Sequence, residues 1–227
     1  MTPISVLLAD DHHIVRQGLR ALLMAEGDLN IVGEAQTGRE AVQMAAKLYP
    51  EIVIMDLAMP RLNGWEATRQ ILKAVPTAKV IVLSSYGDDE HVQMAIASGA
   101  AAYLLKQTAA ADLVKAIREV KKGNAFFSPA IATQLREQTC KPPETGEPQT
   151  PADVPLTSRE LEVLQLIAEG FANKQIAGEL GLSVKTVEKH RQQVMNKLNI
   201  HDTAGLVRHA VAKGIIEMKL AGVPAAA

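Results

Sequence analysis

The 227-residue chain has little cysteine, few aromatic side chains and no long hydrophobic run. Its single cysteine, Cys140, excludes an intrachain disulfide and favours a reducing compartment. No apolar run approaches the roughly 18 residues that a membrane-spanning helix needs, and the N-terminus lacks the basic start of a secretory signal. We therefore expect a cytoplasmic protein with no membrane partner.

Charge is unevenly distributed, although the formal net charge is only −1. Residues 156–227 carry nine Lys and Arg against seven Asp and Glu, whereas residues 141–155 are net acidic. A mildly basic C-terminal third is a weak indication of a polyanionic partner.

A proline-rich segment separates two regions that have the composition of folded domains. Five prolines fall between 142 and 155, which predicts an extended tether. Ser128 followed by Pro129 predicts the start of a short helix that ends near Gln138. We expect domains at 1–123 and 156–218, a linker at 124–155, and a flexible tail at 219–227.

The first region alternates short apolar runs with helical patterns. Strands are expected at 4–9, 30–35, 52–55, 79–83 and 101–105, and helices at about 12–27, 39–49, 65–75, 88–98 and 109–122. The stripe of the first helix is expected to include Ile14. This alternation predicts a parallel sheet with helices on both faces.

Polar residues follow the predicted strands at their carboxyl ends, the edge where open α/β sheets bind ligands. They are Asp10, Asp11, Asp56, Ser84 and Lys106. Clustered carboxylates repel one another, and Mg²⁺ relieves that repulsion, while an ammonium and a hydroxyl can hold anionic oxygens. Each residue alone would more often be a helix cap or a surface residue. Together they predict phosphoryl transfer onto Asp56, giving an aspartyl phosphate.

Two histidines, His12 and His13, adjoin this cluster. Adjacent residues of a helix point in different directions, so we expect both to be surface residues beside the site that could contact a phosphodonor.

Four motifs of this region resemble the receiver domain of two-component response regulators: ADD at 9–11, IVIMDLAMPRLNG at 52–64, VLSS at 82–85 and YLLK at 103–106. The resemblance implies a flavodoxin-like sheet of five strands in the order 2-1-3-4-5. It implies that Asp56 is the phosphoacceptor for a histidine kinase, and that Mg²⁺ is bound by Asp10, Asp11, Asp56 and the backbone carbonyl of Ala58. It also implies that Ser84 and Lys106 hold the phosphoryl oxygens, and that Tyr103 is the switch aromatic.

The second region predicts a helix-turn-helix. Thr157 and Glu160 form a capping box for a helix that ends at Gly170, and further helices are expected at 174–180, capped by Asn173, and at 184–199 and 203–213. Gly181 makes the turn between the second and third helices. The third helix places Val187, Val194 and Leu198 on one side and long polar side chains opposite. Such a polar face suits a major groove, although a solvated face looks the same.

The pattern LTSRELEVLQLIAEGFANKQIAGELGLSVKTVEKHRQQVMNKL, within residues 156–214, resembles the LuxR-type helix-turn-helix of NarL/FixJ response regulators. It implies a small all-α domain of four helices that binds promoter DNA, a homodimer formed through Leu206 and Ala210 on the fourth helix, and RNA polymerase as a further partner. The expected DNA contacts are Lys185, Thr186, Glu188, Lys189, His190, Arg191, Gln192 and Asn196.

We therefore expect a DNA-binding response regulator and not an enzyme, in which phosphorylation of Asp56 controls dimerisation and promoter binding. One alternative is a transcription factor with a vestigial receiver that acts without phosphorylation, which the complete set of strand-end residues disfavours. The other is a phosphatase with an aspartyl nucleophile. Such enzymes usually carry a general acid two residues after the nucleophile, where this chain has Ala58.

Overall fold

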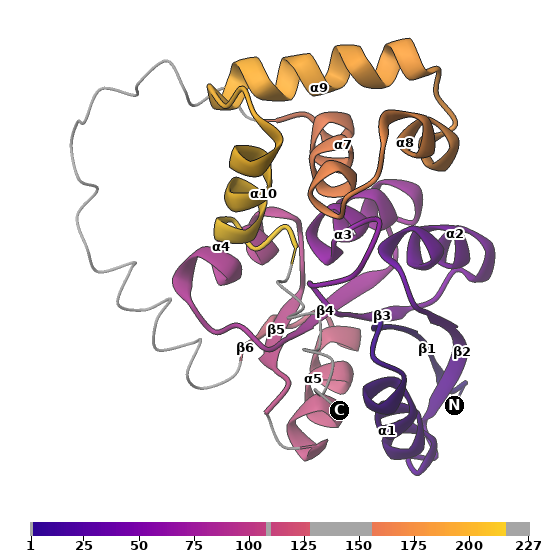
Figure 1. The fold of residues 1–227 in the computed structure, drawn as a ribbon. Coiled ribbons are helices and arrows are strands. Elements are labelled where there is room, and N and C mark those ends of the chain that lie inside the picture. Colours follow the sequence, from indigo (N-terminus) through magenta and orange to yellow (C-terminus); the bar gives the residue numbers. More distant parts are fainter. Residues whose placement is uncertain (1, 108–109, 128–155, 217–227) are drawn as a thin grey trace, which may run out of the picture. The chain divides into compact units, whose positions relative to one another are not determined.

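A parallel β-sheet forms the centre of the N-terminal unit, Met1–Gln149, and a helical unit, Thr150–Ala227, follows it in the computed structural model (Figure 1). The structure describes residues 2–107, 110–127 and 156–216. The predicted helix at 128–138, the proline-rich tether and the tail from 219 lie outside these residues. Within the described part of the chain, no helix has the length and hydropathy required to cross a lipid bilayer.

All adjacent strands of the sheet are parallel, in the order β2-β1-β3-β4-β5-β6. The first five strands confirm the predicted positions and order: β1 (Ile4–Ala9), β2 (Leu29–Ala35), β3 (Ile52–Met55), β4 (Lys79–Ser84) and β5 (Ala102–Leu105). The described sheet has one strand more than expected, β6 (Phe126–Phe127), which pairs with β5. A two-residue strand is too short to show alternation, but its two rings pack against different core clusters.

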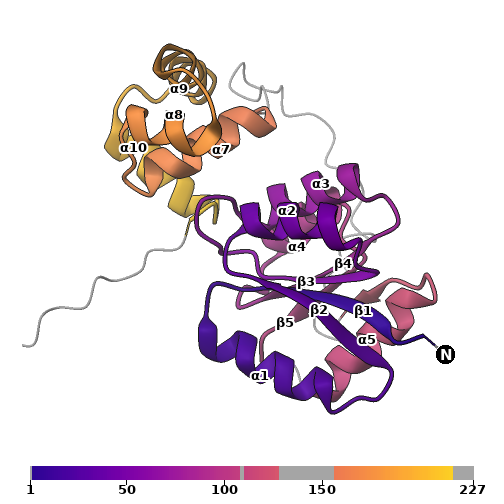
Figure 2. The same ribbon diagram turned by 90° about the vertical axis from the view of Figure 1, so that its right-hand side faces the viewer.

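Helices cover both faces of the sheet, as predicted (Figure 2). One face carries α1 (His13–Met24) and α5 (Ala110–Lys121), and the other carries α2 (Gly38–Leu48), α3 (Gly64–Ala74) and α4 (Asp89–Ala97). Alternate residues of β1 therefore enter different cores: Val6 and Leu8 pack with α1 and α5, whereas Leu7 and Ala9 pack with α2 and α3. The same covering explains why every residue of β3 is buried.

The expectation for Ile14 was wrong, because this side chain is 84% exposed. At about 100° per residue, Ile14 lies roughly opposite Leu23, which is fully buried against the sheet. The buried side of α1 is therefore defined by Leu19, Leu22 and Leu23.

The helical unit contains α7 (Ser158–Ala168), α8 (Asn173–Leu180), α9 (Val184–Leu198) and α10 (Thr203–Ala212) among its described residues. The capping box is confirmed: Glu160 N–H donates to Thr157 Oγ1 (3.3 Å), and Thr157 N–H donates to Glu160 Oε2 (2.8 Å). Asn173 is not the cap of α8. Ala172 occupies that position, and its N–H donates to the Gln175 side chain (2.8 Å).

The turn between α8 and α9 is made by Gly181, whose φ of 64° lies in the left-handed region that favours glycine. Val187 and Val194 of α9 are buried in the core of the unit, and Leu198 packs against that core, as the helical wheel predicts. These features confirm the predicted helix-turn-helix architecture.

Candidate functional site

Strand register brings the predicted strand-end residues to one edge of the sheet. Ala9 pairs with Met55, and the backbone N–H of Asp56 donates to the Ala9 carbonyl (2.8 Å), so Asp10 and Asp56 begin side by side. On the neighbouring strands, the N–H of Lys106 donates to the Ser84 carbonyl (2.8 Å). The strand order reverses at β1 and β3, so Asp10 and Asp56 lie at the topological switch point, where such sheets bind ligands.

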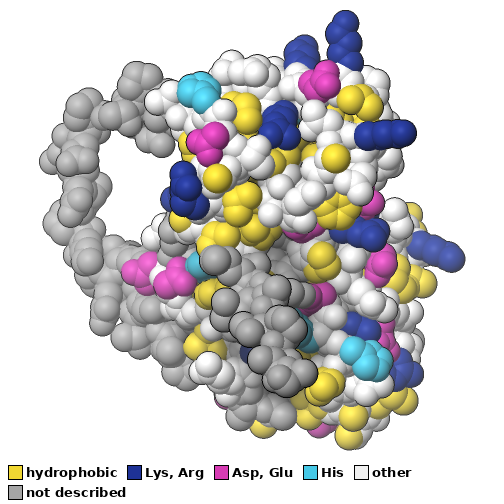
Figure 3. Space-filling model, in the orientation of Figure 1, with side chains coloured by type: hydrophobic (Ala, Val, Ile, Leu, Met, Phe, Trp, Pro, Cys, Tyr) yellow, Lys and Arg dark blue, Asp and Glu magenta, His cyan; other side chains and the backbone are white. Residues whose placement is uncertain are grey.

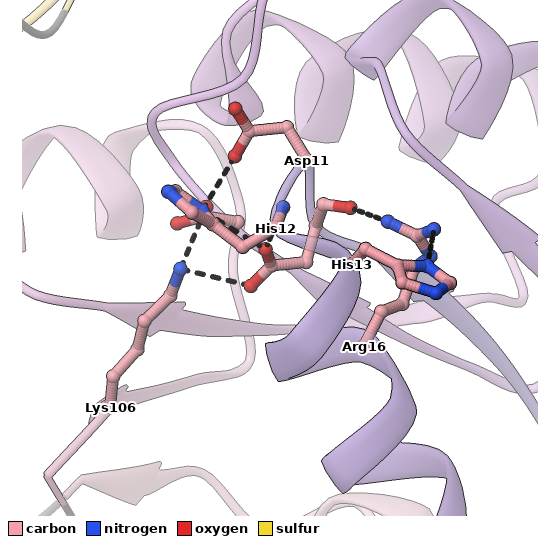
Figure 4. Close-up of polar contacts among 7 residues, drawn as sticks. Asp11, His12, His13, Arg16 and Lys106 are labelled. Carbon is pink, nitrogen blue, oxygen red and sulfur yellow. Dashed lines mark hydrogen bonds and ion pairs between the residues drawn. The ribbon is translucent and has the colours of Figure 1, made fainter. Parts of the chain in front are cut away.

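A single ammonium lies between two buried carboxylates at this edge. Asp10 and Asp56 are 2% and 3% exposed. Lys106 Nζ lies 2.8 Å from Asp56 Oδ2 and 2.9 Å from Asp10 Oδ2 (Figure 4). Burial by itself would lower the pKa of Lys106, but the charges of Asp56 and Asp10 outweigh burial and raise that pKa above its ordinary value. Lys106 is therefore held as a cation where an anionic group would meet Asp56.

The Asp56 carboxyl is held in an environment that disfavours its charge. Burial raises the pKa of Asp56 to about 6; the ammonium of Lys106 opposes this shift, and the charges of Asp10 and Asp11 add to it. Above that pH the carboxylate is ionised and available as a nucleophile, at a cost in folding stability.

This raised pKa predicts a pH-dependent stability for the metal-free receiver. Between the ordinary pKa of 3.8 and about 6, folded Asp56 binds more protons than unfolded Asp56, so stability falls as the pH rises through this window. Asp56→Asn is expected to remove this fall and to stabilise the protein at pH 7.5 by about 1–3 kcal/mol. Urea unfolding at pH 4.5 and 7.5 in a chelator measures the effect, because Trp65, the only tryptophan, reports on the receiver alone.

The matched control is Asp89→Asn, which replaces an exposed carboxylate. This variant should show the same pH dependence of folding stability as wild type. A stability difference between Asp56→Asn and wild type that is the same at both pH values would contradict the prediction.

The donor set at this edge suits a hard divalent cation. Asp10, Asp11, Asp56 and His12 each offer one ligand atom, and these atoms all lie within 4.8 Å of one another. Mg²⁺ prefers carboxylate oxygens and retains water ligands, so the three carboxylates fit the expected ion. Ala58, whose carbonyl was expected to join them, is partly buried in the loop that follows β3.

Tyr86 connects the predicted hydroxyl and the predicted switch aromatic. Its N–H donates to Ser84 Oγ (3.1 Å), and its carbonyl accepts a hydrogen bond from the Tyr103 hydroxyl (2.7 Å). Its ring stacks on His91 with centroids 4.6 Å apart. Tyr103 is fully buried, and that burial raises the pKa of its phenol to about 12. Tyr86 has no signature in the sequence, because these two hydrogen bonds use its backbone atoms.

The loop after Asp56 returns to the site through a close backbone approach. A Cβ on Gly64 would lie 2.0 Å from the Asp56 carbonyl oxygen, and a Cβ on Gly38 would lie 2.1 Å from the Leu62 carbonyl oxygen. Asn63 caps α3 by accepting the N–H of Glu66 (3.0 Å). Only glycine fits at position 64, because the start of α3 packs directly against the backbone of Asp56.

Arg16 is a second site residue that has no signature in the sequence. Its side chain is 5% exposed. The guanidinium donates to Glu34 Oε2 (3.2 Å). It also donates to the backbone carbonyl of Asp10 (2.8 Å), and it lies 3.3 Å from the ring of His13 (Figure 4). Buried arginines are uncommon, and no sequence pattern distinguishes this one from a surface residue of α1.

The outer face of α9 carries most of the predicted DNA contacts. Lys185, Glu188, Lys189, Gln192 and Asn196 are exposed. Figure 3 shows basic side chains projecting from the part of the helical unit that α9 forms in Figure 1. Gln192 Nε2 donates to Asn196 Oδ1 (2.9 Å), so these two amides are aligned on the same face.

Three further predicted contacts are partly buried. Thr186 Oγ1 lies 2.8 Å from Ser183 Oγ at the start of α9. The Arg191 guanidinium donates to Thr203 Oγ1 (2.6 Å) and lies 3.4 Å from Asn173 Oδ1, so it links α9 to the starts of α10 and α8. The third, His190, is also partly buried.

The predicted dimer contacts were wrong. Leu206 and Ala210 are both fully buried in the core of their own unit, together with residues of α7, α8 and α9. Because the apolar stripe of α10 is used to close this core, these two side chains are not available to a second subunit.

Two family comparisons match the two units. Residues 6–118 match the response regulator receiver domain, and residues 154–210 match the bacterial regulatory proteins of the luxR family. The response regulator protein VraR of Staphylococcus saprophyticus subsp. saprophyticus is 36% identical over 215 residues, which cover 95% of this chain and 100% of that protein.

Solved structures of response regulators are similar to this chain over most of its length. RcsB of Salmonella typhimurium, described for its conformational dynamism for DNA interaction, is 28% identical, with 93% of this chain and 100% of that chain covered and a TM-score of 0.56. A structure of two RcsB dimers bound to two parallel DNAs has 28% identity, covers 93% of this chain and 99% of that chain, and has a TM-score of 0.57.

Proposed function

Because the chain belongs to the response regulators that join a receiver domain to a LuxR-type DNA-binding domain, we propose that phosphorylation of Asp56 controls its assembly on promoter DNA. The protein is a DNA-binding regulator of transcription. We infer that Asp56 accepts the phosphoryl group from a histidine kinase, that Mg²⁺ assists the transfer, and that the phosphorylated protein dimerises. A bacterial regulator meets its promoter in the cytoplasm, and we infer that location here.

The observation that carries the proposal is the contact of Lys106 with Asp56. A nucleophilic carboxylate normally repels a phosphoryl group, because both are anionic. Lys106 Nζ, 2.8 Å from Asp56 Oδ2, is close enough to pair with a phosphoryl oxygen as the group arrives. An Mg²⁺ ion held by Asp10, Asp11 and Asp56 would neutralise further phosphoryl oxygens.

The transfer itself needs no proton at the acceptor. One oxygen of ionised Asp56 forms the new O–P bond while the N–P bond of a kinase phosphohistidine breaks, and the electron pair of that bond stays on the imidazole. Ser84 Oγ, which accepts the N–H of Tyr86, can turn its hydroxyl toward a phosphoryl oxygen. Ala58 cannot act as a general acid, so the acyl phosphate persists as a signal.

The DNA-binding half of the proposal rests on α9. Its outer face combines lysine, glutamate and amide side chains, which suit base edges and phosphates. RcsB, a relative with similar structure, has been solved as dimers bound to DNA. We infer that this chain also binds a two-fold promoter site as a phosphorylated homodimer. Its subunits would associate through surfaces other than Leu206 and Ala210. RNA polymerase is the further partner expected at the promoter.

The test compares wild type with Asp56→Asn, each with and without acetyl phosphate and Mg²⁺. Binding to fragmented genomic DNA, with sequencing of the recovered fragments, and sedimentation are measured in parallel. The phosphodonor should strengthen DNA binding and shift only wild type toward a dimer. Identical binding by both proteins in all conditions would favour a regulator with a vestigial receiver, and sustained hydrolysis of phosphomonoesters would favour a phosphatase.

On the DNA face, Lys189→Ala is expected to weaken promoter binding about tenfold or more. Its ammonium is exposed on the outer side of α9, and a base contact contributes roughly 1–3 kcal/mol, whereas a phosphate contact lowers the salt slope by about one. Fluorescence anisotropy at several salt concentrations distinguishes these two roles. Lys122→Ala makes the same charge change on an exposed position of the receiver and serves as the control. Equal losses for the two variants would place Lys189 away from the DNA.

A further inference from the structure

His12 lies outside α1, in a different position from the one expected. The helix begins at His13, and His12 is its N-cap residue with extended backbone (φ −83°, ψ 108°) and no side-chain hydrogen bond to the helix. Its ring turns toward the carboxylates: Nδ1 lies 2.8 Å from Asp11 Oδ1 and 3.4 Å from Asp10 Oδ1 (Figure 4). The neighbouring ring of His13 is directed at Arg16 instead.

The backbone fixes His12 in this place. Its N–H donates to Asp10 Oδ1 (2.7 Å), so the residue is tied to the first carboxylate by its own main chain. With the Asp10, Asp11 and Asp56 oxygens, the ring nitrogen completes four donor atoms that lie within 4.8 Å of one another. Opposite ligands of an ion bound at about 2.1 Å are about 4.2 Å apart, so small adjustments bring all four onto one cation.

An imidazole changes which cation such a site prefers. Carboxylates and water suit Mg²⁺, whereas an imidazole nitrogen strengthens binding to first-row transition ions and adds little for Mg²⁺. We propose that His12 is a nitrogen ligand that lets a first-row transition-metal ion compete with Mg²⁺ at the Asp56 site. This inference rests on the proposed function, because it uses the same carboxylates.

The test measures metal binding to the full chain, without reference to phosphorylation. Isothermal titration calorimetry with Co²⁺ and with Mg²⁺ is carried out on wild type, His12→Ala and His13→Ala. His12→Ala should lose about tenfold or more in Co²⁺ affinity and less than about threefold in Mg²⁺ affinity. His13→Ala removes the neighbouring imidazole, which is also exposed, and should change neither value. The side chain of His12 is 48% exposed, so its replacement should not prevent folding.

A second readout identifies the ligand directly. In the Mn²⁺-loaded protein, pulsed electron paramagnetic resonance should detect a ¹⁴N coupling that persists in His13→Ala and disappears in His12→Ala. Loss of both ions by the same factor in His12→Ala, or an unchanged ¹⁴N coupling, would overturn the inference. Failure of wild type to bind Mg²⁺ would instead overturn the proposed cation at Asp56, so the two failures are distinguishable.

Discussion

Replacing Asp56 with asparagine is expected to abolish phosphoryl transfer to the protein, with a fall in rate of roughly 1,000-fold or more. The amide is nearly the same shape as the carboxylate and can still accept a hydrogen bond from Lys106, so the fold is preserved. It has no anionic oxygen to attack phosphorus, so no acyl phosphate forms. Intact-protein mass spectrometry after incubation with acetyl phosphate and Mg²⁺ measures the added phosphoryl group.

Two variants sharpen that experiment. Lys106→Met removes the ammonium that touches both Asp56 and Asp10 and should slow transfer while leaving the nucleophile in place. Asp89→Asn changes an exposed carboxylate of α4 and should be phosphorylated at the wild-type rate. Phosphoryl incorporation into Asp56→Asn at the wild-type rate would show that another residue is the acceptor.

Gly64→Ala is expected to destabilise the receiver by about 3 kcal/mol. The new methyl group would lie 2.0 Å from the Asp56 carbonyl oxygen and 2.8 Å from the Leu57 Cα. Both neighbours are backbone atoms, so relief requires the α3 terminus to move away from β3. Urea unfolding, followed by Trp65 fluorescence, measures the stability, and phosphoryl transfer should slow in the folded variant because the Asp56 backbone is displaced.

The matched control is Gly18→Ala in α1. A Cβ at Gly18 meets nothing within 4 Å, and alanine is the better helix former, so this change should stabilise the receiver by about 0.5–1 kcal/mol. A Gly64→Ala protein as stable as wild type would show that the loop accommodates a side chain, and the close approach to Asp56 would then have no structural consequence.

Local pattern was sufficient for most of the fold. Buried parallel strands are continuous apolar runs, so the first five strands and their order follow from the alternation and the recognised motifs. The clustering of the strand-end residues could also be predicted from the sequence, since parallel register brings the carboxyl ends of neighbouring strands to one edge of the sheet. Asp10 and Asp56 meet for this reason, because Ala9 and Met55 are paired in register.

The features that were missed depend on backbone position or on tertiary partners. His12 was misplaced because the helix starts one residue later than the histidine pair suggested. Arg16 is buried because it reaches the Asp10 carbonyl, a partner that has no signature in sequence. Leu206 and Ala210 form an apolar stripe, but periodicity alone does not distinguish a side that faces the domain's own core from one that faces a second subunit.

Two backbone hydrogen bonds of Tyr86 couple the position of Ser84 to the position of Tyr103. Ser84 Oγ and the Tyr103 hydroxyl are joined through the N–H and carbonyl of this one residue. If the serine leaves Tyr86 for a phosphoryl oxygen, the position of Tyr103 is energetically linked to that departure. Coupling free energy is reciprocal, so a macromolecule that prefers the rearranged surface around Tyr103 shifts the phosphorylation equilibrium of Asp56 toward the acyl phosphate by the same factor. A partner that binds this surface would therefore raise the phosphorylated fraction of the protein at a given concentration of phosphodonor.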